Sequence, residues 1–106
     1  MPTGHKLTAY RLAPAAKTDL ENIWLYTAQN WSADQADRYT DALEDAFDTL
    51  LAMPEIARER FEFTPPVRVH PSAQHMIIYR IESSCLTILR VLGGRQNWQA
   101  LFDIDA

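Results

Sequence analysis

The feature that most constrains the fold is a pair of long amphipathic runs with almost no chain between them. The first run begins at Pro14 and repeats apolar residues at steps of three and four up to about Asn30, which is the spacing of one helical face. Pro54 ends the second run, because proline cannot continue a helix. Between the runs, Ser32 to Gln35 has the form of a capping box that starts a new helix. We therefore predict two antiparallel helices joined as a helical hairpin.

The apolar stripes identify the faces of this hairpin that pack against a core. The stripe of the first helix consists of Ala16, Leu20, Ile23, Trp24, Thr27, Ala28 and Trp31. The stripe of the second helix consists of Ala36, Tyr39, Leu43, Ala46, Phe47, Leu50 and Leu51. Because Trp24 and Trp31 follow the helical spacing, we interpret both as core residues or as residues of the hairpin seam.

Runs with a two-residue alternation predict β-strands on both sides of the hairpin. The candidates are residues 6–12 before it and residues 67–69, 75–82 and 85–92 after it. A tail of about residues 97–106 follows, and 106 residues suit one domain, 1–106. The expected fold class is α+β, with an N-terminal strand, a two-helix antiparallel hairpin, a three-stranded antiparallel meander and a short C-terminal tail.

The last two candidate strands carry apolar residues on both faces. Strict alternation in the last strand would place Arg90 and Leu92 on one face and Leu89 and Val91 on the other. A sheet that is apolar on both faces needs a cover on both sides. The helical hairpin covers one face, and the tail has too few residues to cover the other. We therefore expect a partner molecule to cover the second face.

Residue content excludes several kinds of site. The single cysteine, Cys85, excludes a disulfide framework within the chain and a multi-cysteine zinc site. The three histidines, His5, His70 and His75, lack ligand-like spacing, so we expect no metal and no cofactor. No apolar stretch approaches the roughly 20 residues that span a bilayer. Because the N-terminus also lacks the apolar core of a signal peptide, we expect a cytoplasmic protein without membrane contact.

The formal net charge of −4 is distributed unevenly along the chain. Residues 1–54 hold four basic and eight acidic residues, whereas residues 65–100 hold four arginines and one acidic residue, Glu82. The acidic half argues against direct DNA binding by the chain alone. The arginines could pair with carboxylates of a partner, or the two halves could simply attract each other. The residues themselves leave both readings open.

Short segments in collinear order resemble one family. The first half contains Tyr10-Arg11-Leu12-Ala13-Pro14-Ala15-Ala16, Asp19-Leu20-x-x-Ile23-Trp24-x-Tyr26 and Trp31-x-x-x-Gln35-Ala36-x-x-Tyr39. The second half contains Pro54, Arg58, Arg68, His75-x-Ile77-x-Tyr79-Arg80 and Ile88-Leu89-Arg90-Val91-Leu92-x-Gly94-Arg95. Over about residues 8–98 the pattern resembles the ParE branch of the RelE/ParE toxin superfamily. It departs at Gly93, where many such sequences have His, and at Asn97, where an acidic residue is usual.

The resemblance implies the toxic component of a type II toxin–antitoxin system. A toxin of this kind is neutralised by a ParD-like antitoxin, whose disordered tail folds over the toxin. ParE-like toxins poison DNA gyrase (topoisomerase II) and so block replication, without performing bond chemistry themselves. RelE-like relatives instead cleave mRNA on the ribosome. A third possibility is a non-toxic relative of the fold that only binds a partner.

The expected antitoxin contacts combine arginines with apolar anchors. They are Arg68, Ile78, Arg80, Arg90, Leu92 and Arg95. The expected target contacts are Arg95 and Trp98, although Trp98 could instead pack back on the sheet. The alternative endoribonuclease would use Arg68, His75, Arg80 and Arg90. Because no Tyr, His or Lys follows Arg95 to transfer a proton, we prefer a non-enzymatic toxin, in which His75 is a hydrogen-bonded structural residue.

Overall fold

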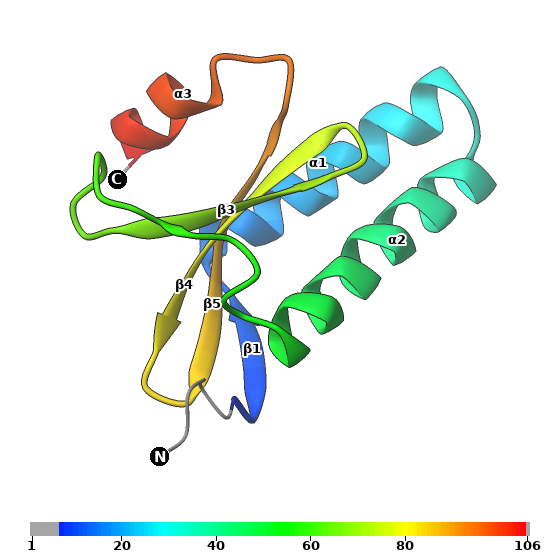
Figure 1. The fold of residues 1–106 in the computed structure, drawn as a ribbon. Coiled ribbons are helices and arrows are strands. Elements are labelled where there is room, and N and C mark those ends of the chain that lie inside the picture. Colours follow the sequence, from blue (N-terminus) through cyan, green and yellow to red (C-terminus); the bar gives the residue numbers. More distant parts are fainter. Residues whose placement is uncertain (1–6, 106) are drawn as a thin grey trace.

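The computed structural model describes residues 7–105. Along the chain its elements are β1 (Ala9–Leu12), α1 (Pro14–Asn30), α2 (Ala33–Ala52), β2 (Glu59–Arg60), β3 (Val67–Ser72), β4 (His75–Glu82), β5 (Cys85–Gly93) and α3 (Trp98–Asp105). Figure 1 shows the helical hairpin beside the sheet, with α3 beyond one end of β5. The predicted α+β class is confirmed. Two elements are additions to the expected order, namely the short strand β2 and the helix α3 in the tail. Lys6, the first residue of the predicted N-terminal strand, lies outside the described residues.

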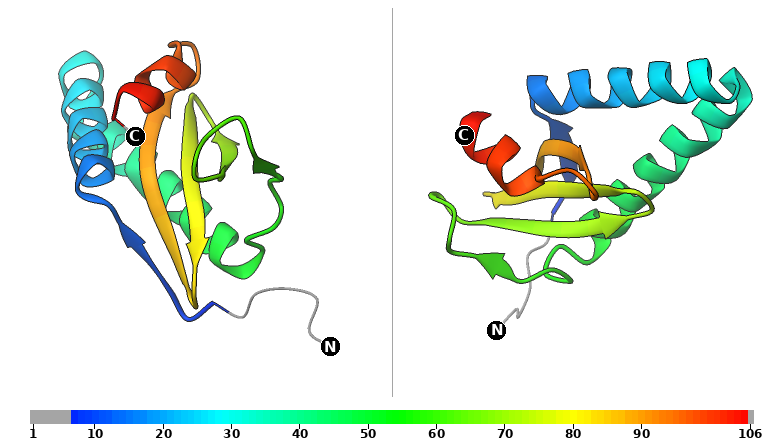
Figure 2. Two further views of the ribbon diagram at one scale, coloured as in Figure 1. Left: turned by 90° about the vertical axis from the view of Figure 1, so that its left-hand side faces the viewer. Right: turned by 90° about the horizontal axis from the view of Figure 1, so that it is seen from above.

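The five strands form one sheet in the order β1-β5-β4-β3-β2. β3, β4 and β5 form the predicted antiparallel meander. β1 runs parallel to β5, with Leu12 opposite Ile88, because the helical hairpin provides the long connection that parallel neighbours require. Figure 2 shows this arrangement from two further sides.

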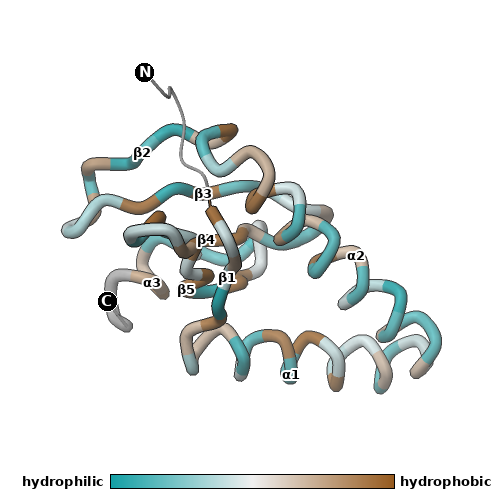
Figure 3. The backbone as a smooth tube through the Cα atoms, turned by 90° about the horizontal axis from the view of Figure 1, so that it is seen from below, coloured by the Kyte–Doolittle hydropathy of each residue, from teal (hydrophilic) through white to brown (hydrophobic). Residues whose placement is uncertain are grey.

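The helical hairpin forms where the sequence predicts it. α1 begins with Pro14 in its first turn, where the missing N–H costs nothing. The side chain of Ser32 caps α2 by accepting the N–H of Gln35 at 3.0 Å. From this turn the two helices run back along the sheet and diverge (Figure 2). α2 alternates between hydrophilic and hydrophobic residues (Figure 3), as expected for a helix with one buried face.

The two tryptophans of the predicted apolar stripe do not share one environment. Trp24 donates its indole N–H to Asp37 on α2 at 2.8 Å, and so lies in the hairpin seam. Trp31 is 68% exposed, so its assignment to the core or the seam is wrong. Its position after the last residue of α1 explains the difference, because the side chain lies beyond the helical face that packs on α2.

One hydrophobic core lies between the helical hairpin and the sheet. Its buried residues are Ala16, Leu43, Phe47, Leu50, Ile77, Tyr79, Leu86, Ile88 and Val91. Tyr79 is fully buried, and its hydroxyl donates to the carbonyl of Pro54 at 2.7 Å. This bond satisfies the one polar atom of a large core side chain and holds the end of the α2 segment against β4.

A second core covers part of the opposite sheet face. Its buried residues are Phe63, Val67, Val69, Ile78, Leu92, Trp98 and Phe102. The Phe63 ring stacks on Trp98 at 6.2 Å and meets Phe102 edge-on at 5.3 Å. The expectation that the chain cannot cover this face is therefore wrong. The tail forms a helix that places Trp98 and Phe102 one turn apart, and the loop before β3 contributes Phe63.

A β-bulge interrupts the pairing of β4 with β5. Ile78 lies opposite Arg90 while Tyr79 lies opposite Ile88, so Leu89 has no partner. The extra residue shifts the alternation that the sequence predicts for β5. As a result Val91 joins the first core and Leu92 the second, and the side chain of Arg90 reaches α1. Bulges commonly redirect side chains in this way.

Candidate functional site

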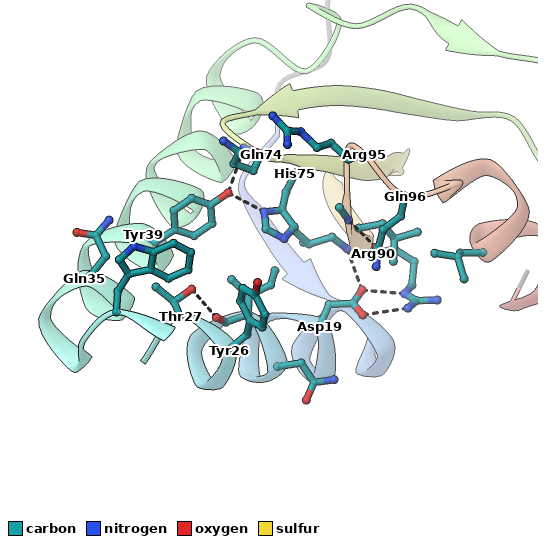
Figure 4. Close-up of a pocket in the computed structure, with 17 residues that line it drawn as sticks. Asp19, Tyr26, Thr27, Gln35, Tyr39, Gln74, His75, Arg90, Arg95 and Gln96 are labelled. Carbon is teal, nitrogen blue, oxygen red and sulfur yellow. Dashed lines mark hydrogen bonds and ion pairs between the residues drawn. The ribbon is translucent and has the colours of Figure 1, made fainter. Parts of the chain in front are cut away.

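A groove of about 1030 Å³ opens between the helical hairpin and the end of β5. Its lining comes from α1, the first turns of α2, the β3–β4 turn with the start of β4, the end of β5 with the segment after it, and α3, and Figure 4 shows the side chains. Grooves lined by apolar and convergent polar groups are the default candidates for a binding site.

An ion pair between α1 and β5 forms one end of the groove. The guanidinium of Arg90 donates from Nε to Asp19 Oδ2 at 2.8 Å and from a terminal nitrogen to Oδ1 at 2.9 Å. The same carboxylate accepts the backbone N–H of Val91 at 2.9 Å. The side chains of Arg90 and Asp19 are only 15% and 11% exposed. The hydrogen bond to Asp19 raises the pKa of Arg90 above its ordinary value.

A hydrogen-bonded chain forms the other end. The backbone N–H of Gln74 donates to the Tyr39 hydroxyl oxygen at 3.1 Å, and that oxygen lies 2.6 Å from His75 Nδ1. Because this oxygen already accepts the Gln74 N–H, we assign the tyrosine proton to His75 Nδ1, which places the imidazole proton on Nε2. Burial lowers the pKa of His75, and nearby Asp19 partly opposes this effect. Burial likewise raises the pKa of Tyr39.

Exposed aromatic side chains line the groove on the hairpin side. Tyr26 is 60% exposed and Trp31 is 68% exposed, and their rings lie 6.2 Å apart. Leu101, which is 38% exposed, also lines the groove. We call Tyr26 and Trp31 the aromatic wall. Large apolar side chains gathered at an exposed groove mark an interaction site. The sequence analysis did not predict this wall. The position of Trp31 directly before the cap residue Ser32 could have indicated it, because a residue there lies outside both helices.

The segment after β5 brings one arginine to the groove without an ionic partner. The backbone N–H of Gly94 donates to the carbonyl of Gln74 at 2.8 Å, which holds this segment against the β3–β4 turn. The side chain of Gln96 accepts the N–H of Gly93 at 3.2 Å. Arg95 lines the groove and is exposed, and it forms no ion pair within residues 7–105. It is thus a cation available to a ligand.

The antitoxin contacts predicted from the sequence do not lie in one place in the structure. Arg90, Leu92 and Arg95 line the groove. Arg68 and Arg80 line a separate hollow of about 150 Å³. Arg68 donates to the carbonyl of Ala57 at 2.6 Å, and Arg80 pairs with Glu82 at 3.2 Å.

Three of the predicted contact residues are buried by the chain itself. Ile78 has no exposed surface, and Leu92 and Trp98 are each 6% exposed. Trp98 packs back on the sheet, and Arg60 lies over its ring at 5.2 Å. In this conformation these three side chains hold the second core together rather than face a partner.

The residues of the alternative nuclease do not converge. His75 and Arg80 are five residues apart on β4, a separation of about 16 Å at the rise of a strand. Arg90 is engaged by Asp19. General acid–base catalysis needs its groups within hydrogen-bond reach of one substrate, and this arrangement does not provide that for the four residues together.

Two kinds of feature are absent from residues 7–105. In that part of the chain, no helix combines the length and apolar character needed to span a bilayer. Within the same residues, no three acidic, histidine or cysteine side chains are grouped so that they could hold a metal ion.

Comparison with known proteins points to one family. A model of the family described as "ParE toxin of type II toxin-antitoxin system, parDE" matches residues 10–98. Toxin ParE1 of Mycobacterium tuberculosis is 36% identical over 89 residues, which cover 83% of this chain and 91% of the relative. Toxin ParE1 of Caulobacter vibrioides is 31% identical over 91 residues, which cover 86% and 94%.

A solved structure described as the chromosomal ParDE TA system from P. aeruginosa has the same fold. The TM-score is 0.72 at 16% identity, over 85% of this chain and 98% of that one. At this identity the likeness concerns the fold alone, whereas the family match and the relatives concern the sequence. The chain therefore belongs to the ParE family of toxins of type II toxin–antitoxin systems.

Proposed function

We propose that this chain is a single-domain, non-enzymatic toxin that inhibits DNA gyrase in the cytoplasm and is neutralised by a ParD-like antitoxin. Membership of the ParE family supports the toxin role. The observation that carries the neutralisation is the groove, because it combines the exposed aromatic wall with the unpaired Arg95. Aromatic and arginine side chains dominate the binding energy of protein interfaces.

The groove suits a peptide segment that folds on binding. Its volume of about 1030 Å³ is large enough for several side chains. A segment seated there would bury Tyr26, Trp31 and Leu101, which are otherwise exposed. Such segments bind by apolar anchors in a groove, with polar groups fixing their register. Arg68 and Arg80 remain proposed contacts for a further part of the same antitoxin tail, in the separate hollow that both residues line.

Neutralisation follows if antitoxin and target share a surface. Of the two target contacts that the sequence suggests, Arg95 is exposed and Trp98 is buried, so we retain Arg95. A segment in the groove would cover Arg95 and thereby exclude the target. No bond chemistry is required for this mechanism, because the toxin acts by occupying a site on its target.

The decisive experiment expresses the full chain without its antitoxin. Gyrase supercoiling and mRNA integrity are then followed in the same cells. Blocked supercoiling with intact transcripts supports the proposal, and cleaved transcripts contradict it in favour of an endoribonuclease. Growth without arrest contradicts it in favour of a relative that only binds a partner. Arg95→Gln should weaken gyrase inhibition, whereas Arg38→Gln, a change of another exposed arginine outside the groove, should not.

A further inference from the structure

The charges that line the groove do not cancel. Asp19 and Arg90 neutralise each other and also bind Val91. Burial raises the pKa of Tyr39 and lowers the pKa of His75, so burial favours the uncharged form of both side chains. Among the described residues of the lining, Arg95 is the remaining charge, so this described part of the groove is positive on a chain whose net charge is −4. This local sign favours an acidic ligand.

Two donors lie at the same end of the groove. His75 pairs with Gly93 across the sheet, and the N–H of Gly94 binds the carbonyl of Gln74. Arg95 therefore follows directly after the segment that lies against His75, and Figure 4 shows both side chains at this end. Since Nδ1 of His75 is engaged by Tyr39, the N–H at Nε2 is the donor that the ring can offer. It has no hydrogen-bond partner within residues 7–105, and no unpartnered side-chain nitrogen there is buried.

An apolar site lies beside these donors. The aromatic wall, Tyr26 and Trp31, lines the groove at the end of α1. Tyr39 also lines the groove and bonds to the His75 ring (Figure 4). An apolar side chain against this wall would lie near a carboxylate held by His75 and Arg95. The two sites together describe the chemistry of the occupant.

We propose that the groove recognises an acidic side chain of the partner segment at His75 and Arg95, next to a large apolar side chain at the aromatic wall. This inference rests on the proposed function, since it names the anchor by which the antitoxin is held. It makes recognition dependent on pH. Protonation of His75 adds a positive charge beside the bound carboxylate, so binding of an acidic segment tightens as the pH falls. The carboxylate itself stays ionised down to about pH 5, because its ordinary pKa is about 4.

The charged and titratable groups around His75 are compatible with this dependence. Asp19 faces it from α1, Tyr39 from α2, and Arg90 and Arg95 from β5 and the segment after it. The carboxylate of Asp19 stays engaged by Arg90 and Val91. Tyr39 stays protonated over the relevant range because burial raises its pKa. Because burial lowers its pKa, His75 is the group among these that gains a charge as the pH falls below about 6.5.

Labelled peptides of about 15 residues provide the test, each long enough to fill a groove. They tile the C-terminal half of the ParD-like antitoxin that the proposed function assigns to this chain. Each peptide is made in its native form and with Asp and Glu replaced by Asn and Gln. Fluorescence anisotropy measures their affinity for the full chain and for the variants Arg95→Gln and His75→Gln. Arg38→Gln serves as the matched control, because Arg38 is exposed on α2 and does not line the groove.

We expect one peptide to bind in its native form, and neutralising its acids to weaken it about tenfold. Arg95→Gln should cost the native peptide a similar factor and cost the neutral peptide nothing. Between about pH 7.5 and pH 5.5, affinity for the native peptide should rise in the wild-type chain and stay flat in His75→Gln. Equal affinity for native and neutral peptides overturns this inference and leaves the proposed function standing. If Trp31→Ala and Arg95→Gln both bind the whole antitoxin normally, the groove is not its docking site, and both this inference and the proposed neutralisation at the groove fall.

Discussion

Asp19 on α1 and Arg90 on β5 form a two-bonded ion pair that ties the helical hairpin to the sheet. β1 ends at Leu12, opposite Ile88, and the N–H of Ala13 bonds to the carbonyl of Ile88. Beyond that point a side chain of α1 binds the edge of β5, because Asp19 also accepts the backbone N–H of Val91. One carboxylate thus continues the pairing where the strand stops. It also forms one end of the groove.

Removing this carboxylate should destabilise the whole chain. Asp19→Asn keeps the size of the side chain but removes the carboxylate charge that binds Arg90 and the N–H of Val91. We expect a loss of about 2 kcal/mol in the free energy of unfolding, because a largely buried, charge-assisted pair of hydrogen bonds is lost. Urea denaturation measures the loss, with Asp41→Asn on the exposed side of α2 as the control. An Asp19→Asn midpoint equal to that of Asp41→Asn would show that the ion pair does not tie the layers together.

The second core gives a prediction with a matched pair of aromatic residues. Phe63 is 5% exposed and contacts Trp98 and Phe102, whereas Phe61 is 71% exposed. Phe63→Ala should cost about 3 kcal/mol, because it opens a cavity in a packed cluster. Phe61→Ala should change stability by less than about 0.5 kcal/mol. Chemical denaturation of both variants checks the difference, and similar losses in the two would mean that α3 and this loop do not cover the sheet as described.

The turn between β4 and β5 offers a stabilising change. Ser83 has a φ of 55°, in the left-handed region where a side chain is strained and glycine is not. Ser83→Gly should therefore raise the free energy of unfolding by up to about 1 kcal/mol. Ser84→Gly is the control, because Ser84 is not among the described residues with positive φ, and there glycine only adds entropy to the unfolded chain. A thermal melt in which Ser83→Gly is the less stable of the two contradicts the assigned backbone.

His75 should make folding stability depend on pH. Burial holds its pKa in the folded chain below the ordinary value of about 6.5. The unfolded chain therefore binds a proton more readily as the pH falls. The stability contributed by neutral His75 is complete above about pH 6.5 and is lost as the pH falls towards the folded pKa. Melting temperatures at about pH 7.5 and pH 5.5 should differ less in His75→Gln than in the wild-type chain.

The control for the pH series is His70→Gln, which changes the other described histidine of the sheet. It should keep the wild-type dependence on pH. If His75→Gln and the wild-type chain lose stability in parallel between the two pH values, another group is responsible.

Local signals in the sequence were sufficient for the helical hairpin. The cap at Ser32 is set by residues three apart, and the structure shows the bond to Gln35. The alternation in residues 75–82 likewise predicts β4, because successive side chains of a strand point to opposite faces of the sheet. Both features depend on neighbours in the chain, and such features are visible in a single sequence.

Features that join distant segments were not visible in the same way. The unpaired Leu89 follows from the register between two strands, and without it Arg90 cannot be placed beside Asp19. The cover of the second face needs Phe63 to meet Trp98, 35 positions further on. The aromatic wall depends on where a helix ends relative to its core face, so Trp31 was assigned to the interior. Tertiary contacts decide each of these cases.

The central claim is that the groove beside the helical hairpin holds the antitoxin. Isothermal titration of the purified antitoxin into the full chain and into Trp31→Ala tests it most directly, with Phe61→Ala as an equally exposed aromatic control. We predict that Trp31→Ala binds at least about tenfold more weakly than the wild-type chain, as for an aromatic anchor of an interface, and that Phe61→Ala binds like the wild type. Unchanged affinity in Trp31→Ala would contradict the account.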